Sequence, residues 1–477
     1  MSQISKIASR GIKFVTLLNL IKAIGQILVL YSVSKNVSQS EVILAGLTLS
    51  FISIAQVFAE FGLNSSLMYY GKDEDEDVVS TLFWLNLLFS LLVVLLLIIF
   101  AAFISDIYKR IELTNFILLA SCIIPMNSIS SQLKILKERE MEFQSISLIE
   151  INASIVGVIA AIILLNNNFG VISIILGAIV NSAVLLVLLW IFCRDGWVPK
   201  YVLNITKIKK YFKFGLYTFL NNIIGMISHQ ADILVTAFFF NSALAGAYSL
   251  FREFLLGLSR LTNPIVTRVY TPVFVKSNSK SLSTQKSYHF ILYLTAFINV
   301  PSYASVIFYP DFFIKLIFNS EYLIYKSVLQ LISVWALFRS LNNPVGALLI
   351  GYGRAKLSFY WNVVVALLQI VLITGIAGFG IFPYLIALNL FILIITYATW
   401  RCLVYEICEI SLSKYVSSFY KQLISASFAT LLVNFINIYI SADMVFHVAL
   451  FMVFYLIIMA TFDYSNISKL IKGLYRA

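Results

Sequence analysis

Five ionisable side chains interrupt long apolar stretches of this sequence: Lys22, Asp232, Arg252, Glu253 and Arg339. An ionisable group near the centre of a bilayer is costly unless it faces a cavity or a partner. Three of the five are cations, and fixed positive charge in a weakly polar environment strongly attracts phosphate or carboxylate. These residue types predict a buried site for an anionic substrate, with Lys22, Arg252 and Arg339 as its ligands.

Asp232 and Arg252 are predicted to lie at the same depth. The two apolar segments that contain them join near Ser242, midway between the two residues. At a helical rise of about 1.5 Å per residue, both side chains lie roughly 15 Å from that turn. They can pair or line one polar chamber together, and a purely structural tie between the helices stays an alternative. Glu253 is expected on a different face, in a cleft open to the cytoplasm.

Three further polar residues are candidates for ion coupling or for lining the same cavity. Glu60 and Arg260 lie near the predicted cytoplasmic ends of their helices. His229 lies one helical turn before Asp232 and therefore shares its face. The two form either a proton-coupling pair or a polar patch in the cavity wall. A histidine in a cleft also suits an intramembrane acyltransferase, for which His229 and His447 are the candidates.

The composition shows what must position these groups. Of the 477 residues, 60% are hydrophobic and 12% are charged, whereas soluble domains carry about 25% charged residues. This argues against a soluble enzyme, a nucleic-acid-binding module and a disordered protein, and it leaves a polytopic membrane protein. The net charge of +12 is then typical of basic cytoplasmic loops. Because the cysteines are scattered and the sequence contains no Walker A loop or metal-ligand cluster, we expect neither a metal nor a cofactor.

The apolar runs predict an all-α architecture. Each run is continuous rather than alternating, which favours helices over a β-barrel, and each reaches the roughly 20 residues that a spanning helix needs. We predict about 14 spans of this length, centred near Ile24, Ala55, Leu92, Ile124, Val156, Leu176, Ile224, Leu255, Thr295, Ala336, Ala366, Phe391, Thr430 and Phe454.

The basic residues predict the orientation and the division of the chain. With the N-terminus inside, most of the 34 Lys and Arg residues fall on the same side, as the positive-inside rule requires. An even number of spans then places both termini in the cytoplasm. The longest loop, Arg194 to Lys213, separates a six-helix lobe over residues 1–200 from a second over 201–410. Two additional helices and a cytoplasmic tail follow in 411–477.

Two stretches resemble the Wzx-type polysaccharide flippases of the MOP exporter superfamily, which include O-antigen, colanic acid and teichuronic acid exporters. The likeness extends over nearly the whole chain through the layout of the spans. The first stretch comprises Gln230–Val235, Ala243–Leu250, Asn263–Pro264 and Thr271–Phe274, and the second comprises Phe338–Leu349 and Gly351–Arg354.

This resemblance implies a MATE-like bundle of two six-helix lobes plus two helices, in the bacterial cytoplasmic (inner) membrane. It also implies that undecaprenyl-pyrophosphate-linked oligosaccharides, the repeat units of O-antigen or exopolysaccharide, cross to the outer leaflet by alternating access. Family members have a cationic central cavity. Mapped by position, Asp232 and Arg252 fall on the helices that wall this cavity, and Lys22 falls on the first helix.

The resemblance therefore predicts a flippase rather than an enzyme, with a pyrophosphate held by Lys22, Arg252 and Arg339. Coupling to H⁺ or Na⁺ through Asp232, Glu60 or Glu253 is compatible with it. Its expected partners are membrane lipid, a polymerase and a chain-length regulator, and not nucleic acid. Two alternatives stay open. One is a cation-coupled multidrug or small-solute exporter of the same superfamily, against which the buried cations argue, and the other is the intramembrane acyltransferase.

Overall fold

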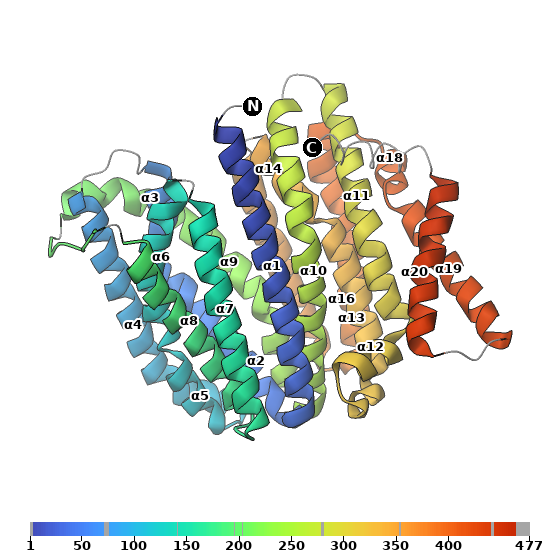
Figure 1. The fold of residues 1–477 in the computed structure, drawn as a ribbon, viewed down its shortest axis with the longest axis horizontal. Coiled ribbons are helices and arrows are strands. Elements are labelled where there is room, and N and C mark those ends of the chain that lie inside the picture. Colours follow the sequence, from blue (N-terminus) through green and yellow to red (C-terminus); the bar gives the residue numbers. More distant parts are fainter. Residues whose placement is uncertain are drawn as a thin grey trace. The chain divides into compact units, whose positions relative to one another are not determined.

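The computed structural model describes residues 3–70, 76–140, 142–194, 196–202, 204–277, 281–352, 354–439 and 443–463. Helices joined by short connections make up most of these ranges (Figure 1). The helices before residue 204 are α1 (Gln3–Asn36), α2 (Gln39–Glu60), α3 (Leu63–Tyr70), α4 (Glu76–Tyr108), α5 (Glu112–Ala120), α6 (Ile123–Arg139), α7 (Phe143–Asn166) and α8 (Ile172–Phe192).

The next helices are α9 (Ile205–Phe239), α10 (Ser242–Ser277), α11 (Ser281–Phe308), α12 (Pro310–Ile317), the 3-10 helix η2 (Ser320–Tyr325), α13 (Lys326–Leu341) and α14 (Asn343–Gly351). The last are α15 (Ala355–Ala377), α16 (Ile381–Thr399), the π-helical stretch η3 (Trp400–Val404), α17 (Tyr405–Cys408), α18 (Leu412–Ser417), α19 (Tyr420–Tyr439) and α20 (Met444–Phe462).

The fold is that of a polytopic membrane protein, as predicted. Within the described residues, 11 helical segments are long and apolar enough to cross a membrane. Every predicted centre lies in a helix. The predicted spans near Ile224, Leu255 and Ala336 are not among these segments. They lie in α9, α10 and α13, which have 35, 36 and 16 residues. Polar residues lower the hydropathy of α9 and α10, and α13 is shorter than the roughly 20 residues of a full span.

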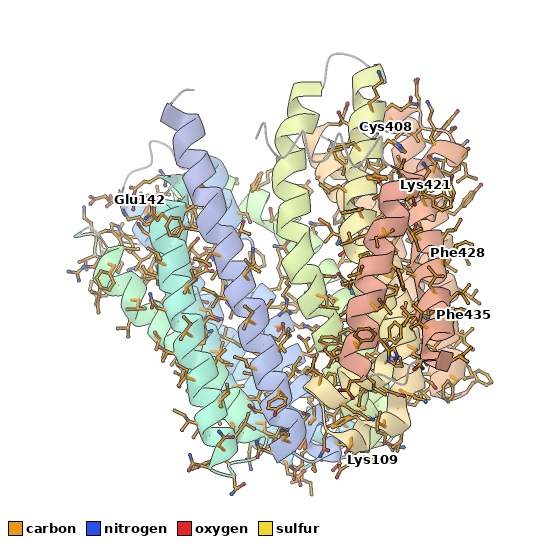
Figure 2. All side chains as sticks on the ribbon, turned by 45° about the vertical axis from the view of Figure 1, so that its right-hand side comes forward. Lys109, Glu142, Cys408, Lys421, Phe428 and Phe435 are labelled. Carbon is orange, nitrogen blue, oxygen red and sulfur yellow. The ribbon has the colours of Figure 1, made fainter. Side chains whose placement is uncertain are left out.

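The apolar side chains that face outward explain why these helices need a lipid environment. On α4, Ile99 and Phe103 are each about 60% exposed, and the residues between them are all apolar. On α19, Phe428 and Phe435 are both more than half exposed and point away from the helix bundle (Figure 2). The two phenylalanines are two helical turns apart and therefore share one face. Such outward-facing surfaces are suited to contact with acyl chains.

Proline divides two of the predicted spans into helix pairs. The span near Ile124 consists of α5 and α6, which meet at Ser121 and Cys122. Pro125 occupies the third position of α6 and has no amide hydrogen to donate to the carbonyl of Ser121, so a new helix begins here. Pro344 occupies the second position of α14 in the same way, a position that suits its fixed φ.

The connection between α8 and α9 is shorter than the predicted loop from Arg194 to Lys213. Helix α9 already begins at Ile205. Its first turns are helical because Ile208 and Tyr211 are buried on one face, while the lysines between them remain exposed. The amphipathic pattern, rather than the number of basic residues, therefore sets this helix boundary.

Residues 196–202, here called the strap, lie along the first turns of α4. The hydroxyl of Thr81 donates to the carbonyl oxygen of Val202 at 3.0 Å. The indole Nε1 of Trp84 donates to the carbonyl oxygen of Lys200 at 2.9 Å, and the rings of Trp84 and Tyr201 stack with centroids 5.0 Å apart. The strap is thus attached to α4 by its own backbone as well as by side chains.

The chain divides into two compact units. Unit 1 comprises Met1–Phe254 and Phe359–Tyr384, and unit 2 comprises Leu255–Ser358 and Leu385–Ala477. The chain passes from one unit to the other within α10, α15 and α16. The lobe boundaries near residues 200 and 410 stay a prediction.

Each unit has its own packing. In unit 1, α7 packs against α1 and α8, and α2 packs against α4, α5 and α9. Buried apolar residues of these helices, such as Ile43, Leu47, Ile117 and Ile233, form its core. In unit 2, α11 packs against α13 and α19, and α19 packs against α20. Unit 1 contains most of the predicted site residues and is described first below.

Candidate functional site

A polar cavity of about 340 Å³ lies inside unit 1. Helices α1, α2, α6, α7 and α8 each contribute to its wall. Four of its lining residues are charged, five are uncharged but polar, and the others are apolar. They are Lys22, Glu60, Lys134 and Glu150; Asn127, Ser130, Ser131, Asn181 and Ser182; and Ala153, Leu185 and Leu189. A cavity with this lining can hold water and charged groups within the membrane, whereas the surrounding lipid chains cannot solvate them.

Glu150 is the centre of this cavity's charge network. Its Oε2 lies 2.9 Å from Nζ of Lys22, and its Oε1 lies 2.5 Å from Nζ of Lys134. The glutamate side chain is 9% exposed, whereas those of the two lysines are 41% and 37% exposed. The carboxylate is therefore enclosed and compensated by two cations, and each ammonium group has three N–H donors and belongs to a residue that lines the cavity.

Small residues bring the helices close enough for this contact. Gly25, one turn beyond Lys22 on α1, faces Val158 of α7, and a Cβ at Gly25 would lie 2.9 Å from Val158 Cγ2. On the other side of α7, a Cβ at Gly157 would lie 2.9 Å from the carbonyl oxygen of Gly177 on α8. Close packing through small residues is characteristic of helices in membranes.

Glu60 is the second carboxylate of the cavity. It is the last residue of α2 and accepts a hydrogen bond from Nε2 of Gln56 at 3.1 Å. Helix α2 ends here because Phe61 adopts a left-handed conformation, with φ 42°, and Gly62 follows at φ 68°. With both carboxylates and both lysines ionised, the lining carries no net charge.

Asp232 and Arg252 form a buried ion pair, as their equal predicted depth suggested. Nε of Arg252 lies 2.5 Å from Oδ2 of Asp232, and the two side chains are 0% and 2% exposed. The Tyr248 hydroxyl donates to the same carboxylate oxygen at 3.1 Å, and the Ile233 amide donates to Oδ1 at 3.0 Å. Both oxygens of Asp232 are therefore satisfied within the helices, and this geometry favours the structural tie between α9 and α10.

The remaining donors of Arg252 reach its neighbours. Nη1 lies 3.2 Å from Oε1 of Glu253, and Nη2 donates to the carbonyl oxygen of His229. Glu253 is one-third exposed and accepts a hydrogen bond of 2.7 Å from Nε2 of Gln26 on α1. Its carboxylate is therefore held by α1 and by Arg252. The cleft open to the cytoplasm stays a prediction. His229 joins the network through its backbone carbonyl and through its ring, whose Nδ1 lies 3.4 Å from the same Nη2 of Arg252.

Arg260 and Arg339 belong to unit 2. Arg260 is exposed on α10. Arg339 lies on α13, with its guanidinium carbon 4.9 Å from the centre of the Trp335 ring, a cation–π contact. The assignment of Lys22, Arg252 and Arg339 as one set of phosphate ligands stays a prediction. The side chains of Asn263–Pro264 and Thr271–Phe274, and residue Gly353, all part of the motifs above, lie outside the described residues.

Sequence reasoning missed both Glu150 and Lys134. Glu150 interrupts the apolar run of α7, so the rule that singled out Lys22 also applies to it. Lys134 lies within α6, and its contact with Glu150 depends on the packing of α6 against α7, which the sequence alone does not show. Among the residues that the structure describes, no group of three or more His, Cys, Asp or Glu side chains comes together as a metal site does.

The fold defines the class of protein. The chain matches the lipid II flippase MurJ in an inward closed conformation with a TM-score of 0.76 at 16% identity, over 98% of this chain and 100% of MurJ. It matches an inward-facing MATE multidrug transporter of the MOP superfamily with a TM-score of 0.61 at 12% identity, over 83% and 99% of the two chains. The architecture is therefore the MOP fold.

The sequence defines the family. Residues 37–327, more than half of the chain, match the polysaccharide biosynthesis protein family. The teichuronic acid biosynthesis protein TuaB of Bacillus subtilis (strain 168) is 24% identical over 77% of this chain and 76% of its own length. The lipopolysaccharide biosynthesis protein WzxC of Escherichia coli (strain K12) is 27% identical over 66% and 64% of the two chains. The chain belongs to this family of polysaccharide biosynthesis transporters, which confirms the resemblance.

Proposed function

We propose that this protein is a flippase that carries undecaprenyl-pyrophosphate-linked oligosaccharide units across the bacterial cytoplasmic membrane. Family membership and the MOP fold support transport linked to polysaccharide synthesis. The observation that carries the finer proposal is the convergence of Lys22 and Lys134, from two helices, on one point of a polar cavity. Two ammonium groups at one point form a natural receptor for a phosphoryl group.

The cavity also accounts for the uncharged part of the headgroup. Serine and asparagine side chains from α6 and α8 line it beside the lysines. Hydroxyl and amide groups can both donate and accept hydrogen bonds, as sugar hydroxyls require. In our proposal the phosphates meet the lysines, the first sugars meet these polar groups, and the prenyl chain stays in lipid.

The fold supports a path across the membrane by alternating access. MOP-superfamily MATE transporters have been solved in inward-facing and outward-facing conformations. We propose the same alternation here, with both termini in the cytoplasm. In that orientation Glu60, at the end of α2, and Lys134, near the end of α6, place the cavity in the cytoplasmic half of unit 1. A headgroup made in the cytoplasm would meet the lysines first.

Export of surface polysaccharide in a strain that lacks the native gene tests this proposal. We expect the K22Q/K134Q variant to lose export, because each charge-assisted contact contributes about 1.5–3 kcal/mol and two of them change affinity by about a hundredfold or more. Since this variant leaves Glu150 uncompensated, the triple variant K22Q/K134Q/E150Q provides a neutral cavity for the same measurement.

The matched control is K35Q, which removes a lysine from the same helix. Lys35 contacts the ring and hydroxyl of Tyr31 at the end of α1 and does not line the cavity, so export should persist. Normal export by the stably expressed triple variant would refute the lysine site. The same strains also test the alternative function. If the wild-type chain confers drug resistance, and the triple variant loses that resistance while it still exports polysaccharide, the protein is better described as a small-solute exporter.

A further inference from the structure

We propose that Glu150 is an internal competitor of the substrate: it occupies the two lysines until a phosphoryl group displaces it. This inference rests on the proposed function and names the residue that regulates its site. The carboxylate of Glu150 presents one oxygen to Lys22 and the other to Lys134. A phosphoryl group would present two oxygens to the same pair of donors.

The charge balance of the cavity requires such an exchange. In the lining, Lys22 and Lys134 are balanced by Glu60 and Glu150, and Oε1 of Glu138 also lies 4.0 Å from Nζ of Lys134, so an anion entering the intact network gains no net attraction. The two lysines cannot hold Glu150 and a phosphoryl group with the same contacts. When the phosphoryl group takes those contacts, its ion pairs with the lysines replace those of Glu150. The phosphoryl group carries more negative charge than the carboxylate, so the exchange favours it.

The position of Glu150 suits a group that must remain close to its lysines. It is held on α7, whose packing against α1 and α8 is fixed by Gly25, Gly157 and Gly177. After displacement the carboxylate stays beside the bound phosphates without its partners. The resulting repulsion weakens the bound state, which favours release once the cavity opens to the other side. Glu150 therefore lowers affinity and increases turnover.

Binding of farnesyl pyrophosphate to the purified full-length protein in lipid nanodiscs tests the first half of this proposal, with farnesol as the ligand that lacks phosphate. We expect E150Q to bind farnesyl pyrophosphate about tenfold more tightly than the wild type, the change expected when one charged competitor is removed. E150D keeps the charge on a shorter side chain, so its affinity for farnesyl pyrophosphate should lie between those of the wild type and E150Q. If E150Q fails to fold, E150D is the variant that tests the proposal.

The matched control is E142Q, which removes another carboxylate from a lysine outside the cavity. Glu142 lies 3.2 Å from Nζ of Lys137, at the start of α7 (Figure 2), and this variant should bind within about twofold of the wild type. Equal or weaker binding by folded E150Q, or by E150D where that variant is decisive, would overturn the role of Glu150. Absence of phosphate-dependent binding by the wild type would instead count against the proposed function.

Export measures the second half of the proposal. A variant that binds more tightly but releases slowly should export less polysaccharide than the wild type. We therefore expect E150Q to combine increased affinity with export reduced by about tenfold, the factor that one lost contact of this strength produces. Increased affinity with unchanged or increased export would show that Glu150 plays no part in release.

Discussion

At the scale of single residues, two ion-pair systems of unit 1 differ in their access to water. Arg252 and Asp232 are enclosed, and the aspartate oxygens have backbone or tyrosine donors as well. Lys22 and Lys134 instead extend into a cavity. A fully enclosed pair acts mainly as a structural element, because neither charge can exchange its partner without leaving the other one unpaired.

Breaking the enclosed pair should destabilise the protein. We expect D232N to lower the free energy of unfolding by about 3–5 kcal/mol, the cost of a buried charge without its partner. The double variant D232L/R252M should lose less than D232N, since it leaves no unpaired charge. Thermal unfolding in detergent, followed by helical circular dichroism, measures both.

The exposed pair of Lys200 with Glu76, 2.8 Å apart, supplies the control, and K200Q should leave the unfolding temperature essentially unchanged because exposed ion pairs contribute little. If D232N unfolds like the wild type while R252Q abolishes farnesyl pyrophosphate binding, Arg252 is a substrate ligand and not a structural tie.

How far the residues of the site could be predicted depended on whether their partners lay on the same hairpin. Asp232 and Arg252 lie on consecutive helices, so counting from the turn placed them together. Lys22 and Glu150 are 128 positions apart, and their contact depends on the packing of α1 against α7. A sequence gives the depth of a residue in its own helix, but it does not state which helix will be its neighbour.

At the scale of elements, close packing of α7 against α8 supports the cavity wall. We expect G157A to destabilise the protein by about 1–3 kcal/mol, because the new methyl group overpacks the interface, where it would lie 2.7 Å from Cβ of Asn181. Thermal unfolding again measures the effect. The control G375A in α15 has open space around its Cβ and should be neutral or stabilising by up to about 1 kcal/mol. Equal melting temperatures for the two variants would contradict this account of the wall.

Helix existence was easier to predict than helix boundaries. Every centre predicted from a continuous apolar run lies in a helix, because burial in lipid demands both length and hydropathy. The helix boundaries depended on single residues, whose effect is lost when hydropathy is averaged over a whole span. Pro125 separates α5 from α6, and the buried side chains of Ile208 and Tyr211 extend α9 into a basic stretch.

At the scale of the whole molecule, the predicted orientation can be tested by labelling. In a cysteine-free variant we expect I111C, between α4 and α5, to react with a membrane-impermeant maleimide added to intact cells. R194C, after α8, should react only after the cells are permeabilised. Both positions are exposed in the structure, so a difference reports the side of the membrane. The reverse pattern would place the termini outside.

The strap affects where this protein can be altered for further experiments. Insertion of an affinity tag or a protease site at residues 196–202 would break the hydrogen bonds to Thr81 and Trp84. The segment that leads into α9 would then no longer be attached to α4. The turn at Asn167 and Asn168 is exposed, and Asn168 already adopts a left-handed backbone with φ 63°. An epitope for antibody-assisted imaging is better placed at this turn, where extra chain disturbs little.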